Sequence, residues 1–395
     1  ETPKQGATRI TKGHNRMSVR KRTWTTRKGE QKESWIVDYT DQNGERHIQT
    51  FDRKKDADDC HAAIKVDVGK GVHTAHSKSL SIAQAAENWI KYVELEKRER
   101  TTVVQYRNHV DNHINPRLGR ERLAKLTTPR IQAFRDELLA ALSRAQAKKV
   151  LTSLKSLLKD AQRRGHVAQN VAVSVSIKRD NRDKARLKVG VDIPTPDEIK
   201  RIIHAATGRM RRLLIVAIFT GLRSSELRGL RWDDVDLEAK ELHVRQRADR
   251  YNEMGKPKSE AGERVIPLGP MVVNTLREWR LACPRGELGL ALPNAMGKIW
   301  NHAGIVRAMC RTMVAAGVVD AEGEAKYTGL HSLRHFYASW CINRKADGGL
   351  ELPAKSVQAR MGHSSIVITM DTYGHLFPNT DDGSELAEAE KALLA

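Results

Sequence analysis

The chain has 395 residues, and its 69 Lys and Arg residues outnumber its 48 Asp and Glu residues to give a formal net charge of +21. This length predicts two or three domains, each large enough to bury a core without disulfides. The longest apolar run, residues 213–219, is too short to span a membrane, no secretory signal is predicted, and the four scattered cysteines lack zinc-site spacing. A membrane protein, a coiled coil, collagen and a disulfide mini-protein are therefore excluded.

The excess positive charge is concentrated in one part of the chain. Residues 77–192 carry 25 basic and 12 acidic side chains, a net charge of +13, whereas residues 1–76 carry +5 and residues 193–395 carry +3. Because such a charge causes self-repulsion unless a polyanion neutralises it, nucleic acid is the predicted partner. No segment pairs a basic face with a broad apolar face, so binding to a membrane surface is not predicted.

A small sheet-and-helix domain is predicted over residues 17–73, after a basic arm (1–16) that is either disordered or an addition to the natural chain. Asn43-Gly44 is the strongest hairpin signal, because both positions of a tight turn favour a positive φ. The alternating strands and the helix that follows them are predicted at 19–27, 34–40, 45–51 and 54–68. The candidate DNA contacts are the basic residues of the first strand, Arg20, Lys21 and Arg22.

Residues 77–176 are helical by pattern, and we expect them to form a compact basic bundle. Ser81 is predicted to cap a helix that ends near residue 99. Thr128, which precedes a proline, is predicted to cap a helix that ends near residue 142, and Ser143 the next one. Lys148 and Lys149 of that last helix are further candidate DNA contacts. Residues 177–192, which are charged and lack an apolar period, predict an interdomain linker.

A third domain is predicted over residues 193–377, with a tail at 378–395. Thr195 is expected to cap its first helix, because Glu198 occupies the capping-box position. Further helices are predicted at 209–220, 271–281, 303–316, 332–343 and 354–361, and strands at 242–247 and 264–268. The predicted fold class is therefore a multidomain, mostly helical α+β protein: a three-stranded sheet with a helix, then a helical bundle, then a mixed α/β domain.

Three clusters of this last domain contain the residue types that phosphodiester cleavage requires. They are T-G-L-R-S-S-E-L at 220–227, H-S-L-R-H at 331–335, and G-H-S-S at 362–365 with Tyr373 ten residues after its histidine. Two arginines can neutralise nonbridging phosphate oxygens bidentately, and a tyrosine can attack phosphorus once a base or a positive field helps it to deprotonate. Taken singly, the clusters are better explained as a structural ion pair, a capped helix start and a packed tyrosine, respectively.

In this order the clusters resemble those of the tyrosine recombinases, and most of all the integrases of temperate phages and integrative elements, such as lambda integrase. The resemblance implies an arm-site-binding domain at 17–73, a core-binding domain at 77–176 and a catalytic domain at 193–377. It also implies a recombinase that integrates or excises a mobile or viral genome through a 3′-phosphotyrosine link, with no metal and no other cofactor. By the same resemblance, the phosphate-activating residues and the nucleophile are Arg223, His331, Arg334, His363 and Tyr373.

The family also implies a lysine on a β-hairpin that protonates the departing 5′ oxygen. Lys258 fits this position, because it precedes a polar turn that leads to R-V-I-P-L at 264–268. Lys256, two residues earlier, lies on the same face of a strand and stays an alternative. Tyr337 and Tyr251 are alternative nucleophiles, although we expect Tyr337 to be a core residue.

The resemblance further implies the partners of the chain. They are double-stranded DNA attachment sites, three further copies of the chain in a homotetramer on DNA, an accessory DNA-bending protein and a directionality factor. The resemblance also implies that the protein acts at the nucleoid in the cytoplasm of a bacterial host. A type IB topoisomerase and a DNA-binding regulator without catalysis stay open as alternative functions. The residues around 345–349 exceed the family pattern, and we expect them to form a surface loop.

Overall fold

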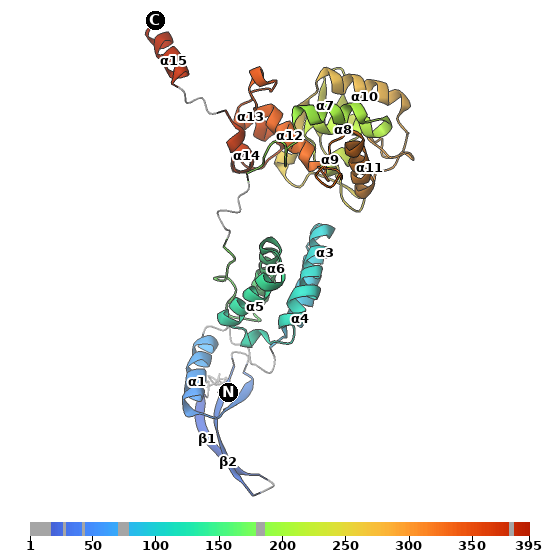
Figure 1. Ribbon diagram of the computed structural model, residues 1–395. Coiled ribbons are helices and arrows are strands. Elements are labelled where there is room, and N and C mark those ends of the chain that lie inside the picture. Colours follow the sequence, from blue (N-terminus) through green and yellow to red (C-terminus); the bar gives the residue numbers. More distant parts are fainter. Residues whose placement is uncertain (1–16, 27–28, 42–43, 70–78, 179–185, 379–382) are drawn as a thin grey trace, which may run out of the picture. The chain divides into compact units, whose positions relative to one another are not determined.

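The computed structural model describes residues 17–26, 29–41, 44–69, 79–178, 186–378 and 383–395 (Figure 1). Its contacts divide the chain into two compact units, Glu1–Asp180 and Asn181–Ala395. The expected basic arm at 1–16 lies outside the described residues. None of the described helices is long and apolar enough to cross a membrane.

The first unit begins with an antiparallel sheet that packs against one helix, as the sequence predicts. The elements are β1 (Ser18–Thr25), β2 (Gln31–Thr40), β3 (Arg46–Phe51) and α1 (Lys54–Gly69), and the strand order is β1-β2-β3. Val37 and Tyr39 of β2 are fully buried against Ala57 and Ile64 of α1. This small core holds the helix on one face of the sheet. On the other face, called the open face below, Ile36 of β2 is buried, but the side chains of Arg20 and Arg22 on β1 are exposed.

The hairpin at Gly44 differs in detail from the expected two-residue turn. Gly44 has φ +82°, but the backbone N–H of Asp41 donates to the carbonyl of Glu45 at 2.9 Å, which leaves three residues in the loop. Asn43 lies outside the described residues. The first hairpin repeats the pattern, with Gly29 at φ +82° and Thr26 bonded to Glu30 at 2.8 Å. Both loops therefore use a single left-handed glycine.

The register of β1 corrects the expected basic surface. Arg20 and Arg22 pair with Ile36 and Ser34 and lie on the open face of the sheet. Lys21 pairs with Trp35 and lies on the face that α1 covers, where its ammonium group is 2.6 Å from Glu33. Because successive side chains of a strand point to opposite faces, the three residues do not form one basic surface on a single face of the sheet.

The helical bundle of the first unit has more breaks than predicted. Its helices are α2 (Ile82–Leu95), α3 (Arg100–His109), a π-helical turn (Val110–Ile114), α4 (Asn115–Leu118), α5 (Thr128–Ala141) and α6 (Arg144–Arg163). Ser81 and Ser143 are the caps, as expected. The helix predicted to reach residue 99 ends at Leu95, because Lys97 takes a left-handed conformation with φ +52°. The cap of α5 is Thr127, not Thr128, whose hydroxyl donates to the carbonyl of Val171.

The second unit surrounds α8 (Gly208–Thr220), whose residues 213–218 are all buried. Helices α7 (Pro196–Ala205), α10 (Pro270–Ala282), α11 (His302–Ala315) and α12 (His331–Ile342) contact it. Thr195 caps α7 with the predicted capping box. The remaining elements are α9 (Ser224–Gly229), β4 (Val235–Asp236), β5 (Glu241–Val244), β6 (Arg247–Ala248), β7 (Met254–Gly255), β8 (Arg264–Pro267), α13 (Ala354–Met361), α14 (Ile366–Tyr373) and α15 (Ser384–Leu394).

The predicted interdomain linker differs from expectation, whereas the predicted surface loop near residue 345 is present. The second half of the predicted linker belongs to the unit, because Leu187 packs on its core and Val189 forms a bridge with Ile193. The extra residues at 345–347 form an exposed 3₁₀ turn that ends at the left-handed Gly348, as a surface loop should. The linker within the described residues is therefore shorter than predicted.

Candidate active site

Gly221 and the turn after it bring the first cluster into position. Gly221 ends α8 in a left-handed conformation with φ +61°, and a Cβ atom at this position would lie 2.3 Å from the ring of Tyr337. Only glycine satisfies both conditions. Its carbonyl accepts a hydrogen bond from the Arg334 guanidinium at 2.5 Å. The glycine break therefore joins the first cluster, which begins α9, to the second cluster on α12.

Glu226 on α9 fixes the orientation of Arg223. The carboxylate accepts from the Arg223 guanidinium at 2.7 Å and from Arg264 at 2.9 Å, and it is 3% exposed. Burial alone would raise the pKa of Glu226, but the two guanidiniums outweigh burial and lower the pKa to about 2. The structural ion pair that the sequence allowed is therefore present, and it orients Arg223 so that this side chain also donates to the carbonyl of Gly362 at 2.8 Å.

Arg334 is a buried cation that backbone carbonyls hold in place. It is 2% exposed and donates to the carbonyls of Gly221 and Met361. Burial and the nearby charge of Arg223 lower the pKa of Arg334 to about 9, so it stays charged at neutral pH. With Arg264, three guanidiniums surround the single carboxylate of Glu226. The site has excess positive charge and suits a phosphate.

His331 and His363 lie beside these arginines and are neutral at physiological pH. Burial, followed by the charges of Arg334 and Arg223, lowers the pKa of both, that of His363 to about 4. The Nδ1 atom of His363 is 2.9 Å from the hydroxyl of Thr369, which leaves Nε2 as the other polar atom of the ring. His363 also stacks on Tyr373, with ring centroids 6.3 Å apart.

Tyr373 is the last residue of α14 and lies in the same cluster. It is 2% exposed, and its hydroxyl is 2.7 Å from Nδ1 of His335. Burial raises the pKa of Tyr373 to about 12, although Arg334 and Arg223 act in the opposite direction. The structure thus brings together five of the six expected catalytic residues.

His335 is the residue of this site that the sequence reasoning missed. It is the final histidine of H-S-L-R-H, and it lies one helical turn after His331, with ring centroids 4.5 Å apart. The i, i+4 spacing on a helix carries the signal, because it places both rings on one side of α12.

The structure does not bring the predicted lysine into this cluster. Lys258 is exposed in the connection from β7 to β8, as is Lys256, and within the described residues neither side chain forms an ion pair. The carbonyl of Lys256 accepts from Arg247 at 3.0 Å, which fixes the backbone there. The choice between the two lysines stays a prediction.

The surroundings of the two alternative nucleophiles, Tyr337 and Tyr251, differ from those of Tyr373. Tyr337 is 1% exposed and packs in the core next to Gly221, as expected, and burial raises its pKa. Tyr251 lies in the turn between β6 and β7.

The two lysines of the helical bundle that we expect to contact DNA are accessible at its surface. Lys148 and Lys149 are exposed on α6, and in the described part of the chain no carboxylate pairs with either. By contrast, Arg163 and Arg164 at the end of α6 both pair with Asp160. Lys148 and Lys149 are therefore better placed to bind phosphates than Arg163 and Arg164.

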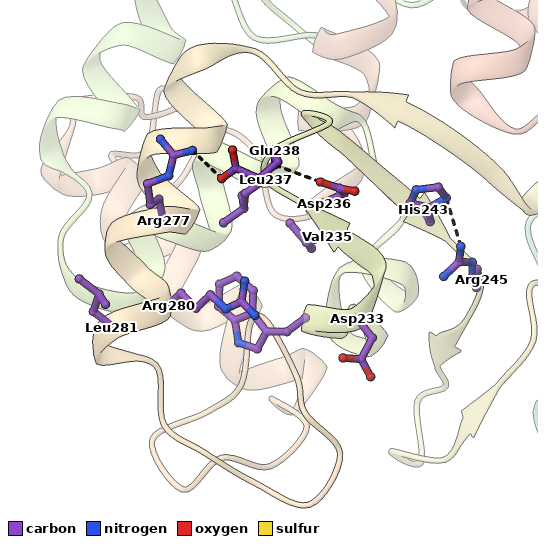
Figure 2. Close-up of a pocket in the computed structure, with 11 residues that line it drawn as sticks. Asp233, Val235, Asp236, Leu237, Glu238, His243, Arg245, Arg277, Arg280 and Leu281 are labelled. Atoms are coloured by element: carbon purple, nitrogen blue, oxygen red, sulfur yellow. Dashed lines mark hydrogen bonds and ion pairs between the residues drawn. The ribbon is translucent and has the colours of Figure 1, made fainter.

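A pocket of about 620 Å³ lies elsewhere on the second unit, and Figure 2 shows its lining. Its arginines are already engaged: Arg277 pairs with Glu238 at 3.3 Å, and Arg280 lies over the ring of Trp232. None of the expected catalytic residues lines it. Over the described residues, the one group of three potential metal ligands is Asp41, Glu45 and His47 of the first unit, and it contains no expected catalytic residue.

The fold and the site together define an enzyme class. Among the described residues, the buried Arg334 and the half-buried Arg223 lie beside a tyrosine and three histidines, and the carboxylate of Glu226 is already held by Arg223 and Arg264. This arrangement fits phosphoryl transfer to tyrosine. The phage integrase family matches residues 194–380, and the phage integrase N-terminal SAM-like domain matches residues 82–139. The chain belongs to the phage integrase family, the tyrosine recombinases, and is a site-specific DNA recombinase.

Individual relatives agree with this assignment. A tyrosine recombinase XerC-like protein of Caldanaerobacter subterraneus is 25% identical over 328 residues, which cover 76% of this chain and 81% of the relative. The Tn1549 transposon integrase in complex with a circular intermediate DNA has a similar structure, with a TM-score of 0.62, 19% identity and coverage of 80% of this chain and 100% of that one. A lambda integrase tetramer bound to a Holliday junction gives a TM-score of 0.56 at 17% identity, over 87% of this chain and 95% of that one. At these identities, the two structures show the fold of the chain.

Proposed function

We propose that this recombinase is an integrase that exchanges strands between two DNA attachment sites and uses Tyr373 as its nucleophile. The observation that carries the proposal is the position of the buried Tyr373 hydroxyl, which lies close enough to the buried Arg334 and the half-buried Arg223 for both charges to lower its pKa against the effect of burial. Arg223 and Arg334 bind the nonbridging oxygens of the scissile phosphate, and His331 and His363 donate further hydrogen bonds to it.

The reaction needs no external energy source in this scheme. The Tyr373 oxygen attacks phosphorus, the bond from phosphorus to the 5′ oxygen breaks, and Tyr373 is left linked to the 3′ phosphate. The phenolic proton passes to a base, and the departing 5′ oxygen takes a proton from Lys258. Because the phosphodiester energy is kept in the tyrosine link, a 5′ hydroxyl of the partner strand can reverse the step.

Lys258 is proposed as the acid although the DNA-free protein holds it at the surface. The side chain of lysine is long and flexible, and the connection from β7 to β8 carries it on an exposed segment. Bound DNA would provide the phosphate charge that draws the ammonium group toward the leaving oxygen. Lys256 is the competing candidate.

The partners follow from strand exchange. Two duplexes with four active sites call for four copies of the chain, and the similar lambda integrase structure is a tetramer on a Holliday junction. We propose that the basic bundle holds the DNA at the exchange site and that the sheet domain binds a separate arm site. An accessory DNA-bending protein and a directionality factor complete the assembly, which acts at the nucleoid in the bacterial cytoplasm.

A single assay separates the three candidate functions. Supercoiled plasmid carrying two attachment sites is incubated with the full chain, and the products are resolved on native and denaturing gels. An integrase yields recombinant circles and a covalent protein–DNA adduct. A topoisomerase yields the adduct and relaxed circles without recombinants, and a DNA-binding regulator yields neither product; either result would contradict the proposal.

A further inference from the structure

We propose that His335 holds the Tyr373 hydroxyl and accepts its proton when the tyrosine attacks the phosphate. The inference rests on the proposed role of Tyr373 and adds the base that the reaction requires. Its main observation is the hydrogen bond of 2.7 Å between the Tyr373 hydroxyl and Nδ1 of His335. Across the described residues, His335 is the one hydrogen-bond partner of that hydroxyl.

The two rings are held in this arrangement from several sides. Tyr373 ends α14, and Phe377 and Leu376, which follow it, pack on the same small core as Val357 and Met361 of α13. The ring centroids of His335 and Tyr373 are 5.7 Å apart at an interplanar angle of 63°. The proposal assigns His335 the tautomer with its proton on Nε2, so that the hydroxyl of Tyr373 donates to Nδ1.

The groups around His335 keep it neutral in the DNA-free protein. Burial is the main cause, and His331 and Arg334 on α12 add to it, so that the pKa of His335 falls to about 4. Asp192, ahead of α7, acts in the opposite direction, and Tyr373 on α14 is the hydrogen-bond partner. A neutral imidazole is the form that can accept a proton, so at neutral pH His335 does not have to lose one first.

The same surroundings keep the tyrosine protonated until DNA arrives. A donor with a pKa of about 12 does not transfer its proton to an acceptor with a pKa of about 4, so the pair is stable and unreactive. The anionic scissile phosphate would offset the charge of Arg334, which raises the pKa of His335. Proton transfer would then accompany formation of the oxygen–phosphorus bond: the O–H bond of Tyr373 breaks, the proton moves to Nδ1, and His335 returns it during religation.

His331 is the alternative acceptor, and the geometry favours His335. His331 lies one turn earlier on α12 and contacts the ring of His335, not the hydroxyl of Tyr373. It also faces Arg334 and Arg223, whose charges both lower its pKa. This position suits a hydrogen bond to the phosphate between the arginines.

The test measures adduct formation by the full chain in a single turnover. The probe is an attachment-site duplex in which sulfur replaces the 5′ leaving oxygen, so that departure needs no general acid. His335→Asn keeps an acceptor oxygen near the position of Nδ1 but cannot take a proton. We expect its rate at neutral pH to fall about 10²–10⁴-fold and to rise about tenfold per pH unit, because solvent must remove the proton. The matched control, His331→Asn, should lose rate but keep the pH profile of the unmodified protein.

The outcomes are distinct. A His335→Asn rate within about threefold of the unmodified rate, or a lower rate with an unchanged pH profile, would overturn the role of His335. A pH-dependent loss in His331→Asn alone would assign the base to His331 instead. Adducts formed by Tyr373→Phe would contradict the proposed nucleophile and not the base. As a measurement independent of activity, the ¹⁵N resonance of Nδ1 in His335 should shift in Tyr373→Phe; no shift would contradict the hydrogen bond.

Discussion

The open face of the N-terminal sheet and the candidate active site both contain two arginines that share one carboxylate. On the sheet, Arg20 and Arg46 pair with Asp38 while 57% and 65% of their side chains stay exposed. In the active site, Arg223 and Arg264 share Glu226, and the exposed fractions are 3% for Glu226, 5% for Arg264 and 36% for Arg223. The first arrangement is screened by water and salt, whereas the second holds its charges in a fixed geometry at low dielectric. The same residue types are therefore hydrated and loosely held in one place, and fixed around a buried carboxylate in the other.

The largest expected difference between the two clusters is in stability. Glu226→Gln leaves the buried Arg264 without its counter-charge, while the half-buried Arg223 is partly screened by water, and we expect the free energy of unfolding to fall by about 3 kcal/mol, the lower end for a broken buried pair. Asp38→Asn, the matched change among exposed arginines, should cost at most about 1 kcal/mol. Urea denaturation measures both. Equal losses would contradict the distinction between the clusters.

The pH dependence of the Glu226 effect has a defined sign. Because the folded pKa of about 2 lies below the ordinary value of 4.5, the carboxylate contributes stability above pH 4.5 and loses it as the pH falls toward 2. The difference between the unmodified chain and Glu226→Gln should therefore be constant at neutral pH and shrink through this window. A difference that grows on acidification would contradict the ion-pair account.

The next largest effect concerns catalysis. Arg334→Lys keeps a positive charge but loses the planar fork that contacts both Gly221 and Met361, so we expect single-turnover cleavage to slow about 10²–10³-fold. Arg20→Lys on the sheet should leave cleavage of a core-site substrate unchanged. Comparable slowing in both variants would mean that the buried geometry has no special role.

A smaller loss is expected for the proposed acid. Lys258→Ala should slow cleavage of a normal substrate about 10²-fold, at the lower end for a general acid, because Lys256 is nearby and exposed. Sulfur at the 5′ leaving position should restore the rate of Lys258→Ala but not that of Arg334→Lys. If Lys256→Ala shows this rescue and Lys258→Ala does not, the two lysines exchange roles.

The smallest effect tests the open face of the sheet. Arg22 is exposed on that face, and within the described residues no carboxylate pairs with it. Arg22→Ala should reduce the slope of log affinity against log salt for arm-site DNA by about 0.9, whereas Lys21→Ala should leave the slope unchanged. Equal changes would mean that both faces of β1 contact DNA.

The sequence predicted the elements more accurately than the surfaces. Hydrophobic period and capping residues located most of the helices, including the caps Ser81, Ser143 and Thr195. Alternation along the predicted strand already separates Lys21 from Arg20 and Arg22, but which of the two faces α1 covers depends on how the strands and the helix pack. The sequence clusters gave five site residues, but the contact between His335 and Tyr373 required the packing of α12 and α14, which no local pattern encodes.

The central claim is that Tyr373 forms the covalent link to DNA. The most direct measurement traps the adduct on an attachment-site duplex, digests the protein and identifies the nucleotide-bearing peptide by mass spectrometry, alongside Tyr373→Phe on a denaturing gel. The account predicts that the nucleotide is attached to Tyr373, and that Tyr373→Phe binds DNA with unchanged affinity but forms no adduct. A nucleotide attached to Tyr337 or Tyr251, or an adduct formed by Tyr373→Phe, would contradict it.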